Sequence, residues 1–557
     1  MQKLKQFIYS NKKIYRFLKG IKYCFAYGPK TAIKIAKRTS IKKVDASHSI
    51  SAYERHLQQK HKFSKSIKFS IIIYALEESE KAITNTIKSI INQTYQNYEI
   101  LIATKTENSS IQKNLFENIF FTKSINEAIE LSSGDYLIKI NSNDFLHPCA
   151  LYEIMNKICS ENSDFIYTDE AVYNQENEYK FKPDFAPDTL RSYNYIGSFF
   201  AFSRKLLNTE NLFSQNIMYA FDYDMILSLT EQASNITHIP KILNFTHPEN
   251  LAENYDEEAK TVLAYHLERT GLEGKIEISD IEHTFKINYT LKSSPLVSII
   301  IPNKDHIGDL KKCIDSILKS TYKNYEIIIV ENNSQNSETF EYYKSIEKQN
   351  IKIITWEKDF NYSAINNFGI KSAKGDYYIL LNNDIEIITP DWIQEMLMFA
   401  QRDNVGAVGA KLLYPDNTIQ HAGVILSILG IAVHYRKGAS ENDEDIRLNT
   451  VQNLSAVTAA CMMIPKHVYN ETGGLNEEFK VAFNDIDLCM RIRKSGYLIV
   501  FNPYCKAYHY ESKSRGLETT SDKKKRFKKE MKIFRKYWSD QLKSEDPYYN
   551  PNLTLPQ

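Results

Sequence analysis

The chain has 557 residues, of which 43% are hydrophobic and 25% charged, and its formal net charge is +2. This length exceeds what one hydrophobic core usually supports, so we expect a globular protein of two domains with attached segments. No apolar run reaches the roughly 18 residues of a membrane-spanning helix, and the seven cysteines form no C-x-x-C pair, which disfavours a zinc site or a disulfide framework.

Residues 1–66 form a basic amphipathic segment. Between Lys3 and Lys43 there are many Lys and Arg and no acid, and apolar residues recur at helical spacing. This pattern is typical of a helix on an anionic membrane surface, or equally of a solvated helix docked on the protein by its apolar face. No signal peptide follows. We therefore expect a cytoplasmic protein, peripheral at the inner face of the cytoplasmic membrane, and no nucleic-acid partner.

An internal repeat organises the rest of the chain. The stretch from Phe69, "FSIIIYALEESEKAITNTIKSIINQTYQNYEILI", parallels "VSIIIPNKDHIGDLKKCIDSILKSTYKNYEIIIV" from Val297, and "SSGDYLIKINSND" parallels "AKGDYYILLNNDI". The repeat predicts two similar domains. Their expected bounds are 67–250 and 295–516, with a linking segment at 251–294 and a basic C-terminal helix and tail at 517–557.

The second copy alternates short β-branched runs with helical patterns. Strands are predicted at 297–301, 326–330, 352–356, 377–381 and 405–412. Strands that are apolar throughout, with helices between them, indicate a parallel sheet covered on both faces. In such sheets the ligand lies beyond the carboxyl ends of the strands. The acids at those ends are Asp305, Glu331, Asp384 and Glu386.

These strand ends favour a metal over a bare phosphate cradle. Neither copy has G-x-G-x-x-G after its first strand, which disfavours a Rossmann dinucleotide site and a P-loop. Because acids repel phosphate, a phosphorylated ligand here needs a divalent cation between them. The alternative is that Asn382, Asn383 and Asp384 simply form a turn, a conformation these residue types favour.

The ordered set of motifs resembles a known family. "VSIIIPNKD", "YKNYEIIIVENNS", "GDYYILLNND", "TIQHAGV", "ETGGLNEEF", "FNDIDLCMRIRKSGY" and "AYHYESKSRG" together resemble the family 2 glycosyltransferases of the GT-A fold. The similarity is greatest to tandem-domain bacterial members that build surface polysaccharides, of the rhamnosyltransferase-like type. It implies an α/β fold with two tandem GT-A domains, which are Rossmann-like nucleotide-diphospho-sugar transferase domains, flanked by basic helical segments.

The resemblance also implies roles for single residues. Asp384 falls at the metal position of the D-x-D element, and His509 at a histidine that contacts the metal or the diphosphate. Asp485 falls at the catalytic base, because a carboxylate there would take the acceptor hydroxyl's proton; its alternative reading is an ordinary helix cap. Asp487, two residues on, is expected to brace the helix. The expected donor-binding set is Pro302, Asp305, Glu331, Asn382, Asn383 and Asp384, with Mg2+ or Mn2+ as cofactor.

The first copy has lost several of these residues. Tyr74 replaces Pro302, Thr104 replaces Glu331, and Asn143 replaces Asp384. Asp144 and the base-like Asp222 are retained, and His247 lies near the histidine position without matching it. Because a neutral strand end holds a divalent ion poorly, we expect an inactive first domain. The alternative is a second active site that uses Asp144 and Asp222.

The sequence therefore predicts an inverting, metal-dependent hexosyl-type glycosyltransferase. It would move a sugar from a UDP- or dTDP-sugar to a growing, lipid-linked surface glycan such as O-antigen or capsule. Two other classes stay open. A nucleotidyltransferase would need a glycine-rich basic loop that "PNKDHIG" lacks, and a non-catalytic glycan-binding scaffold is possible if Asn382 marks decay of the second site.

Overall fold

The computed structural model describes residues 50–75, 80–104, 119–173, 175, 178–207, 213, 216–247, 252–348, 350–426, 432–510 and 520–554. Most of the expected basic N-terminal segment lies outside them. The described chain divides between residues 288 and 289 into two compact units, each built around its own large sheet. No helix among these residues is both long enough and apolar enough to cross a bilayer.

The first unit is an α/β layer structure. Its sheet has the order β3-β2-β1-β4-β8-β6-β9-β5, with β7 beside β6. The strands are β1 (Phe69–Tyr74), β2 (Tyr98–Ala103), β3 (Ile119–Thr122), β4 (Tyr136–Asn141), β5 (Phe145–Leu146), β6 (Phe165–Val172), β7 (Tyr179–Lys180), β8 (Phe200–Ser203) and β9 (Ile236–Thr246). The helices are α4 (Ala52–Lys60), α5 (Glu80–Ile91), α6 (Ile125–Leu131), α7 (Ala150–Glu161), α8 (Pro187–Ser192) and α9 (Phe221–Gln232).

Residues of the expected linking segment have regular structure. Helix α10 (Tyr255–Arg269) packs on α9, and the hairpin of β10 (Gly274–Ile278) and β11 (Phe285–Tyr289) follows it.

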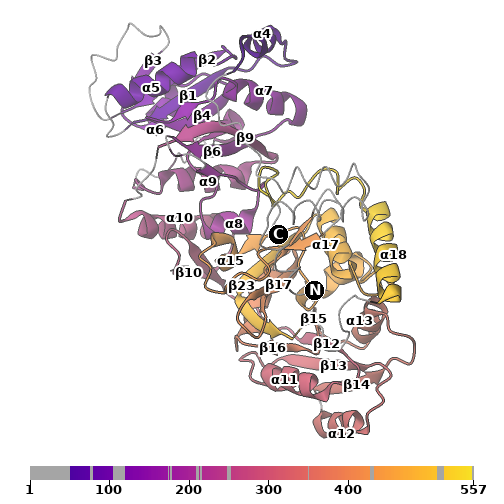
Figure 1. Cartoon of the computed structure of the whole chain (residues 1–557). Coiled ribbons are helices and arrows are strands. Elements are labelled where there is room, and N and C mark those ends of the chain that lie inside the picture. Colours follow the sequence, from indigo (N-terminus) through magenta and orange to yellow (C-terminus); the bar gives the residue numbers. More distant parts are fainter. Residues whose placement is uncertain are drawn as a thin grey trace, which may run out of the picture. The chain divides into compact units, whose positions relative to one another are not determined.

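The second unit repeats the strand order of the first. Its sheet runs β14-β13-β12-β15-β22-β17-β23-β16, so each strand has a counterpart at the same place in the first sheet (Figure 1). The strands are β12 (Val297–Asn303), β13 (Tyr325–Glu331), β14 (Ile351–Thr355), β15 (Tyr377–Leu381), β16 (Ile385–Ile387), β17 (Val405–Leu413), β22 (Cys461–Pro465) and β23 (Leu498–His509). Short strands β18 (Ile419–His421) and β21 (Gln452–Asn453) pair with β17 and β23, and β19 (Val424–Leu426) pairs with β20 (Ala432–His434).

The predicted strands are confirmed, but the expectation of a parallel sheet is wrong in part. Strands β12 to β15 are parallel, whereas β22 runs antiparallel to both of its neighbours, β15 and β17. Apolar content along a strand reports burial on both faces and carries no information on direction, which is why the sequence did not predict the mixed sheet.

Helices flank the second sheet. They are α11 (Ile307–Leu318), α12 (Ser337–Ile346), α13 (Tyr362–Lys371), α14 (Trp392–Ala400), α15 (Ile446–Asn449), α16 (Lys466–Glu471) and α17 (Asn484–Lys494). Helix α13 lies close on the strands because residue 369 is glycine: a Cβ there would come within 2.6 Å of Ile300 and 2.8 Å of Val330. Tight packing of this kind fixes the helix position.

The repeat motif has the same structural role in both units. Glu326 accepts hydrogen bonds of 2.6 Å from the Ser298 hydroxyl and the Lys374 N–H, and Ser298 accepts one from Gly375. In the first unit Glu99, Ser70, Ser133 and Gly134 form the corresponding contacts. This glutamate–serine–glycine tie joins three neighbouring strands and accounts for the repeated Y-E and G-D pairs.

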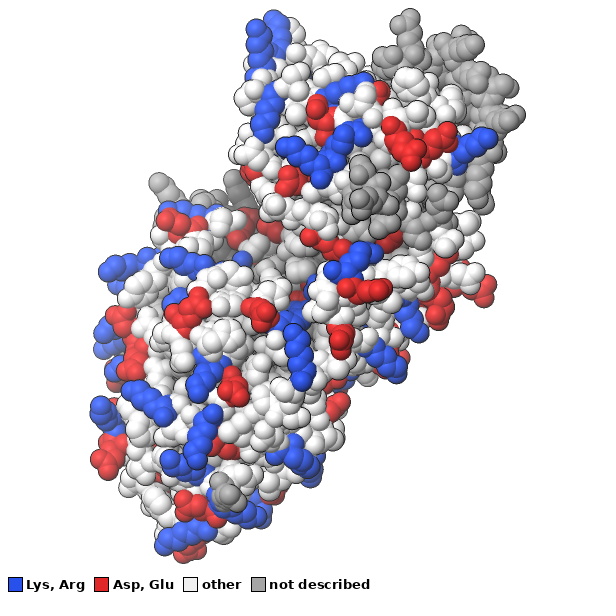
Figure 2. Space-filling model, turned by 180° about the vertical axis from the view of Figure 1, so that it is seen from behind, with Lys and Arg blue, Asp and Glu red and all other residues white. Residues whose placement is uncertain are grey.

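The C-terminal basic stretch forms helix α18 (Ser521–Tyr537), which packs on the second unit through Phe534 and the following Trp538. On the face shown in Figure 2, basic and acidic side chains are interspersed, as expected for a net charge of +2.

Candidate active site

Asp384 and His509 meet at the rim of the second sheet. Asp384 lies between the end of β15 and the start of β16, and His509 is the last residue of β23. The Asp384 Oδ1 and His509 Nε2 atoms are 3.3 Å apart, and both side chains are 8% exposed. The pairing of Ile385 with His509, and the bond from the Tyr510 N–H to the Asp384 carbonyl, hold the two backbones together.

Asn382 adjoins this pair and connects it to the main chain that leads into β22. Its amide Nδ2 is 3.5 Å from His509 Nε2, and its backbone N–H donates to the Ala460 carbonyl. The Tyr362 hydroxyl donates both to Asn382 Oδ1, at 3.2 Å, and to the Ala459 carbonyl, at 3.0 Å. Tyr362 was not singled out in the sequence.

Asp485 reaches the same main-chain segment from the opposite side. It is the second residue of α17, where a carboxylate is stabilised by the partial positive charge of the helix N-terminus. The Ala459 N–H donates to its Oδ2 at 3.3 Å. Residue 459 therefore binds Asp485 through its N–H and Tyr362 through its carbonyl. Asp485 is thereby linked through residue 459 and Tyr362 to Asn382, which adjoins Asp384 and His509; the roles expected for these residues stay predictions.

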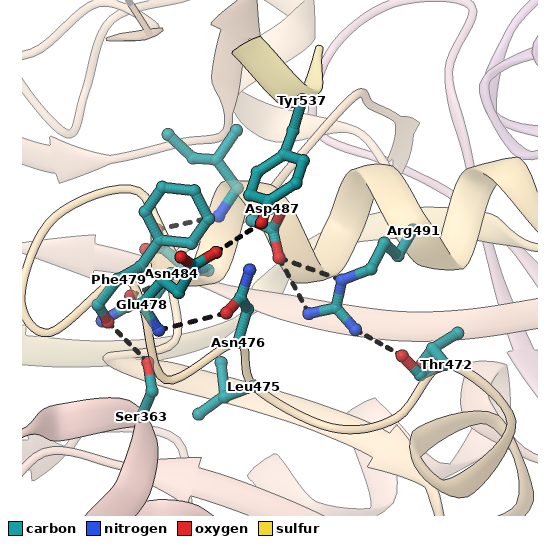
Figure 3. A network of polar contacts seen from close by, with 12 residues as sticks. Ser363, Thr472, Leu475, Asn476, Glu478, Phe479, Asn484, Asp487, Arg491 and Tyr537 are labelled. Carbon is teal, nitrogen blue, oxygen red and sulfur yellow. Dashed lines mark hydrogen bonds and ion pairs between the residues drawn. The ribbon is translucent and has the colours of Figure 1, made fainter. Parts of the chain in front are cut away.

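Asp487 points away from Asp485, as predicted from their spacing. It is 2% exposed, forms an ion pair of 2.9 Å with Arg491 one turn on, and accepts a hydrogen bond from Trp538 Nε1. Arg491 in turn donates to the Thr472 carbonyl, as Figure 3 shows. Asp487 thus braces α17.

The glycines before α17 make a plain turn. Gly473 and Gly474 have φ of +77° and +68°, and Gly474 donates to the Tyr469 carbonyl. Their positive φ angles let the chain turn at the C-terminus of α16, and this local role is enough to explain both glycines.

The other donor-site residues lie at the ends of β12 and β13. Glu331 is 3% exposed and accepts from the Ser334 N–H. Asn383 donates to Asn303 Oδ1 at 2.6 Å, which joins the end of β15 to that of β12 and adds Asn303, a residue not singled out in the sequence. Pro302 precedes it, half-buried.

Asp305 has a local structural role. Its Oδ1 accepts from the Gln335 and Asn336 N–H groups at the start of α12. Desolvation opposes ionisation, but these backbone donors outweigh it and lower the pKa of Asp305. A carboxylate oxygen held in this way is less available to a ligand.

A divalent ion fits between Asp384 and His509. An octahedral ion with ligands at 2.0–2.3 Å places neighbouring donor atoms about 3 Å apart, close to the observed 3.3 Å. Magnesium is commonly held by one or two carboxylates plus substrate phosphates rather than by a full protein cage. Within the described residues, no group of three or more His, Cys, Asp or Glu is placed to hold an ion, so an ion here would need its remaining ligands from substrate or water.

A pair of histidines, the buried His421 and the half-buried His434, lies beside the proposed base. His421 Nε2 accepts from the Gly423 and Thr458 N–H groups, so Nδ1 carries its proton and donates to His434 Nδ1 at 2.8 Å. Burial and the neighbouring His434 lower the pKa of His421 well below its usual value, which keeps it neutral. Thr458 precedes residue 459, so this pair adjoins Asp485. The "TIQHAG" motif, which contains His421, was the sequence feature that could have pointed to this pair.

In the first unit, a lysine lies beside the carboxylate that corresponds to Asp485. Lys139 replaces Leu380 of the second copy, is 1% exposed, and lies 2.5 Å from both Asp222 Oδ1 and Asn141 Oδ1. Asp222 is the counterpart of Asp485, as the second residue of α9. Burial raises the pKa of Asp222 and Lys139 opposes the rise. Tyr74 stacks on Phe221 and lies 5.5 Å from the Lys139 ammonium.

The strand register identifies the counterpart of His509. Phe145 pairs with Phe245 in the first unit, as Glu386 pairs with Tyr508 in the second. Thr246 therefore stands where the second copy has His509, and His247 lies one residue beyond. The first unit thus lacks both predicted metal ligands, and its base-like carboxylate is paired with an internal ammonium.

A family comparison agrees with this geometry. Residues 298–471, which include β12 to β15 and the Asn382–Asp384 element, match the sequence model of the glycosyl transferase family 2. The second unit carries a family 2 glycosyltransferase domain. Its sheet is of the Rossmann-like GT-A type, and the first unit has the same strand order.

Relatives extend the similarity to both units of the chain. An uncharacterized protein of Sinorhizobium fredii, y4gI, is 35% identical over 523 residues, which cover 87% of this chain and 57% of that protein. The O-antigen biosynthesis protein RfbC of Myxococcus xanthus is 31% identical over 456 residues, covering 78% of this chain and 35% of RfbC. The chain therefore spans little more than half of the first relative and about a third of the second.

Among solved structures, GalNAc-T7 with UDP, GalNAc and Mn2+ has a TM-score of 0.38 at 14% identity, over 48% of this chain and 52% of that one. A TM-score of this size identifies no ligand or mechanism for the present chain.

Proposed function

We propose that this chain transfers a sugar, with inversion at the anomeric carbon, from a nucleotide-diphosphate donor to a growing cell-surface glycan, and that the working site is in the second unit. The similarity to an O-antigen biosynthesis protein supports the glycan class. UDP- and dTDP-sugars are the donors to test first.

One observation carries the proposal: residue 459 holds Asp485 on one side and, through Tyr362, the Asn382–Asp384–His509 group on the other. A site for inverting transfer needs a base and a diphosphate-binding group at separate but fixed positions, because the new bond forms opposite the departing group.

Asp384 and His509 would hold Mg2+ or Mn2+ together with the donor diphosphate. When bound, such an ion neutralises charge on the departing nucleoside diphosphate. Glu331, Asn383, Pro302 and Asp305 lie at the strand ends where the nucleotide would lie.

Asp485 would act as the general base. It takes the proton from the acceptor hydroxyl as that oxygen attacks the anomeric carbon. Asp487 would keep α17 in place without contacting substrate.

Release of nucleoside diphosphate from a panel of nucleotide sugars, with and without Mn2+, tests the proposal. Asp384→Asn and Asp485→Asn should each lower the rate by at least about 10²-fold, the usual contribution of such a group. Asp222→Asn, the matched change in the first unit, should leave it unchanged. Release that survives Asp485→Asn but disappears with Asp222→Asn would move the working site to the first unit.

The first unit has a specific obstacle to catalysis. The alternative of two active sites needs Asp222 to accept a proton, yet Lys139 lies 2.5 Å from it and Thr246 replaces the histidine ligand. These features support an inactive first unit that binds glycan or stabilises the second. A protein that releases no diphosphate from any donor would instead fit the glycan-binding scaffold.

The acceptor is proposed to be lipid-linked, and the protein to be peripheral at the inner face of the cytoplasmic membrane. Such an acceptor would give the basic segments of the chain a role in holding the enzyme near its substrate.

A further inference from the structure

Helix α18 carries a face on which lysines predominate, with Ser521 and Arg535 in the same arc. Six lysines of this helix are exposed: Lys524, Lys525, Lys528, Lys529, Lys532 and Lys536. At about 100° per residue they fall within an arc of about 140° and extend over about 18 Å of helix. We call these six residues the lysine face.

The charges of the lysine face are almost uncompensated. Within the described residues, Lys525 alone of the six has an ion pair, 3.9 Å from Asp522, and that carboxylate is 94% exposed. Four pairs of these lysines are spaced i, i+4, an arrangement that destabilises an isolated helix. An anionic partner would relieve that repulsion.

The opposite side of α18 is fixed to the segment that carries the proposed base. Glu530, 2% exposed, accepts from the Lys480 and Ala482 N–H groups at 3.2 and 2.8 Å. Phe534 stacks on Phe483, the residue before α17, with ring centroids 5.1 Å apart.

The residue after the helix completes this attachment. The indole of Trp538 donates to Asp487 at 2.9 Å. Tyr537 donates to Glu478, as Figure 3 shows. Whatever binds the lysine face is therefore held at a fixed position relative to α17.

We propose that the lysine face binds a bilayer surface containing anionic phospholipid and so holds Asp485 close to that surface. The inference rests on the proposed function, since a lipid-linked acceptor is presented at a bilayer. Juxtamembrane lysines attract anionic headgroups without specific pockets. A nucleic acid is the less suitable partner, because Phe527, the aromatic residue between Lys525 and Lys528, lies outside the arc of the lysines and packs on Phe483.

The test uses the full chain and vesicles of phosphatidylcholine with and without 30% phosphatidylglycerol. The test variant changes Lys524, Lys528, Lys532 and Lys536 to Gln. The control changes Lys311, Lys319, Lys344 and Lys348, all exposed in the same unit, so both variants lose the same charge. Each lysine near an anionic surface contributes roughly fivefold to binding, so the test variant should bind phosphatidylglycerol vesicles at least about 100-fold more weakly, and the control should bind like the unchanged chain.

A loss of less than threefold in the test variant, or an equal loss in both variants, would overturn the proposal. A test variant that loses binding to single-stranded DNA but keeps vesicle binding would assign the face to nucleic acid. Thermal unfolding checks that both variants are folded. Diphosphate release measured without vesicles separates the two proposals. If the chain releases diphosphate but the test variant binds vesicles as the unchanged chain does, only the proposal for the lysine face is overturned. If the lysine face binds vesicles but the chain releases no diphosphate, only the proposed function is overturned.

Discussion

Replacing Lys139 by leucine, the residue found at the same place in the second copy, should destabilise the first unit strongly. The substitution leaves Asp222, whose side chain is 23% exposed, without the ammonium that lies 2.5 Å away. Removing one partner of a buried ion pair usually costs about 3–5 kcal/mol. Because Asp222 keeps some solvent, we expect about 3 kcal/mol. The double variant Lys139→Leu with Asp222→Leu should recover about 2 kcal/mol of this loss, because it leaves no unpaired charge.

Hydrogen exchange of the α9 amides, read by mass spectrometry, measures the loss of unfolding free energy in the first unit alone. A local measurement is needed because the two units need not unfold together. A loss of about 3 kcal/mol corresponds to exchange that is faster by about 100-fold. Diphosphate release from the second unit should not change. Two results would refute the view that this ion pair stabilises the first unit. One is a Lys139→Leu variant whose stability lies within 1 kcal/mol of the unchanged chain, and the other is a double variant that is no more stable than Lys139→Leu alone.

Three further changes test other contacts. In the first unit, the Lys68 ammonium and the Ser70 and Ser133 donors outweigh burial and lower the pKa of Glu99 to about 2. Its contribution to stability is therefore complete above pH about 4.5 and is lost as the pH falls through 2. Glu99→Gln should cost about 1–2 kcal/mol in urea unfolding at pH 7 and much less at pH 2, where half of the carboxyls are protonated in the folded state; an equal loss at both pH values would contradict this. Trp538→Phe keeps the packing but removes the donor to Asp487, and should lower the free energy of unfolding by about 1–2 kcal/mol, measured by thermal unfolding. An unchanged unfolding temperature would mean that a water molecule replaces the indole as the donor to Asp487. Tyr362→Phe removes the hydroxyl between Asn382 and the Ala459 carbonyl, and should slow diphosphate release about tenfold at saturating donor with a small change in KM; a change in KM alone would assign Tyr362 to donor binding.

The sequence predicted most of the fold because its signals are local. Runs of β-branched residues located five strands of the second unit to within two residues, and self-similarity predicted the duplicated domain. Motif order singled out Asp384 and His509, which the structure places 3.3 Å apart. The reversed direction of β22 was not predictable, since the run "CMMIP" is buried in either direction.

The contacts that modify the site are long-range, and the sequence did not reveal them. A lysine inside the apolar run "YLIKIN" was visible, but its partner Asp222 lies on a distant helix. Asp305 looked like a ligand because it follows a strand, yet its oxygen holds the start of α12. Thr246 could be identified as the counterpart of His509 only from the strand register. The two copies differ in length between the end of the fourth strand and this residue, so sequence alignment alone does not match them.

The glutamate–serine–glycine tie is present in both halves, whereas the groups at the sheet rim are not. The chain thus carries an internal control for any mutational survey. A position where the two copies agree reports on the architecture, and a position where they differ reports on what one copy does and the other does not. Transplanting the rim of the second copy onto the first, beginning with leucine at 139, aspartate at 143 and histidine at 246, would measure how few side chains separate a silent domain from a working one.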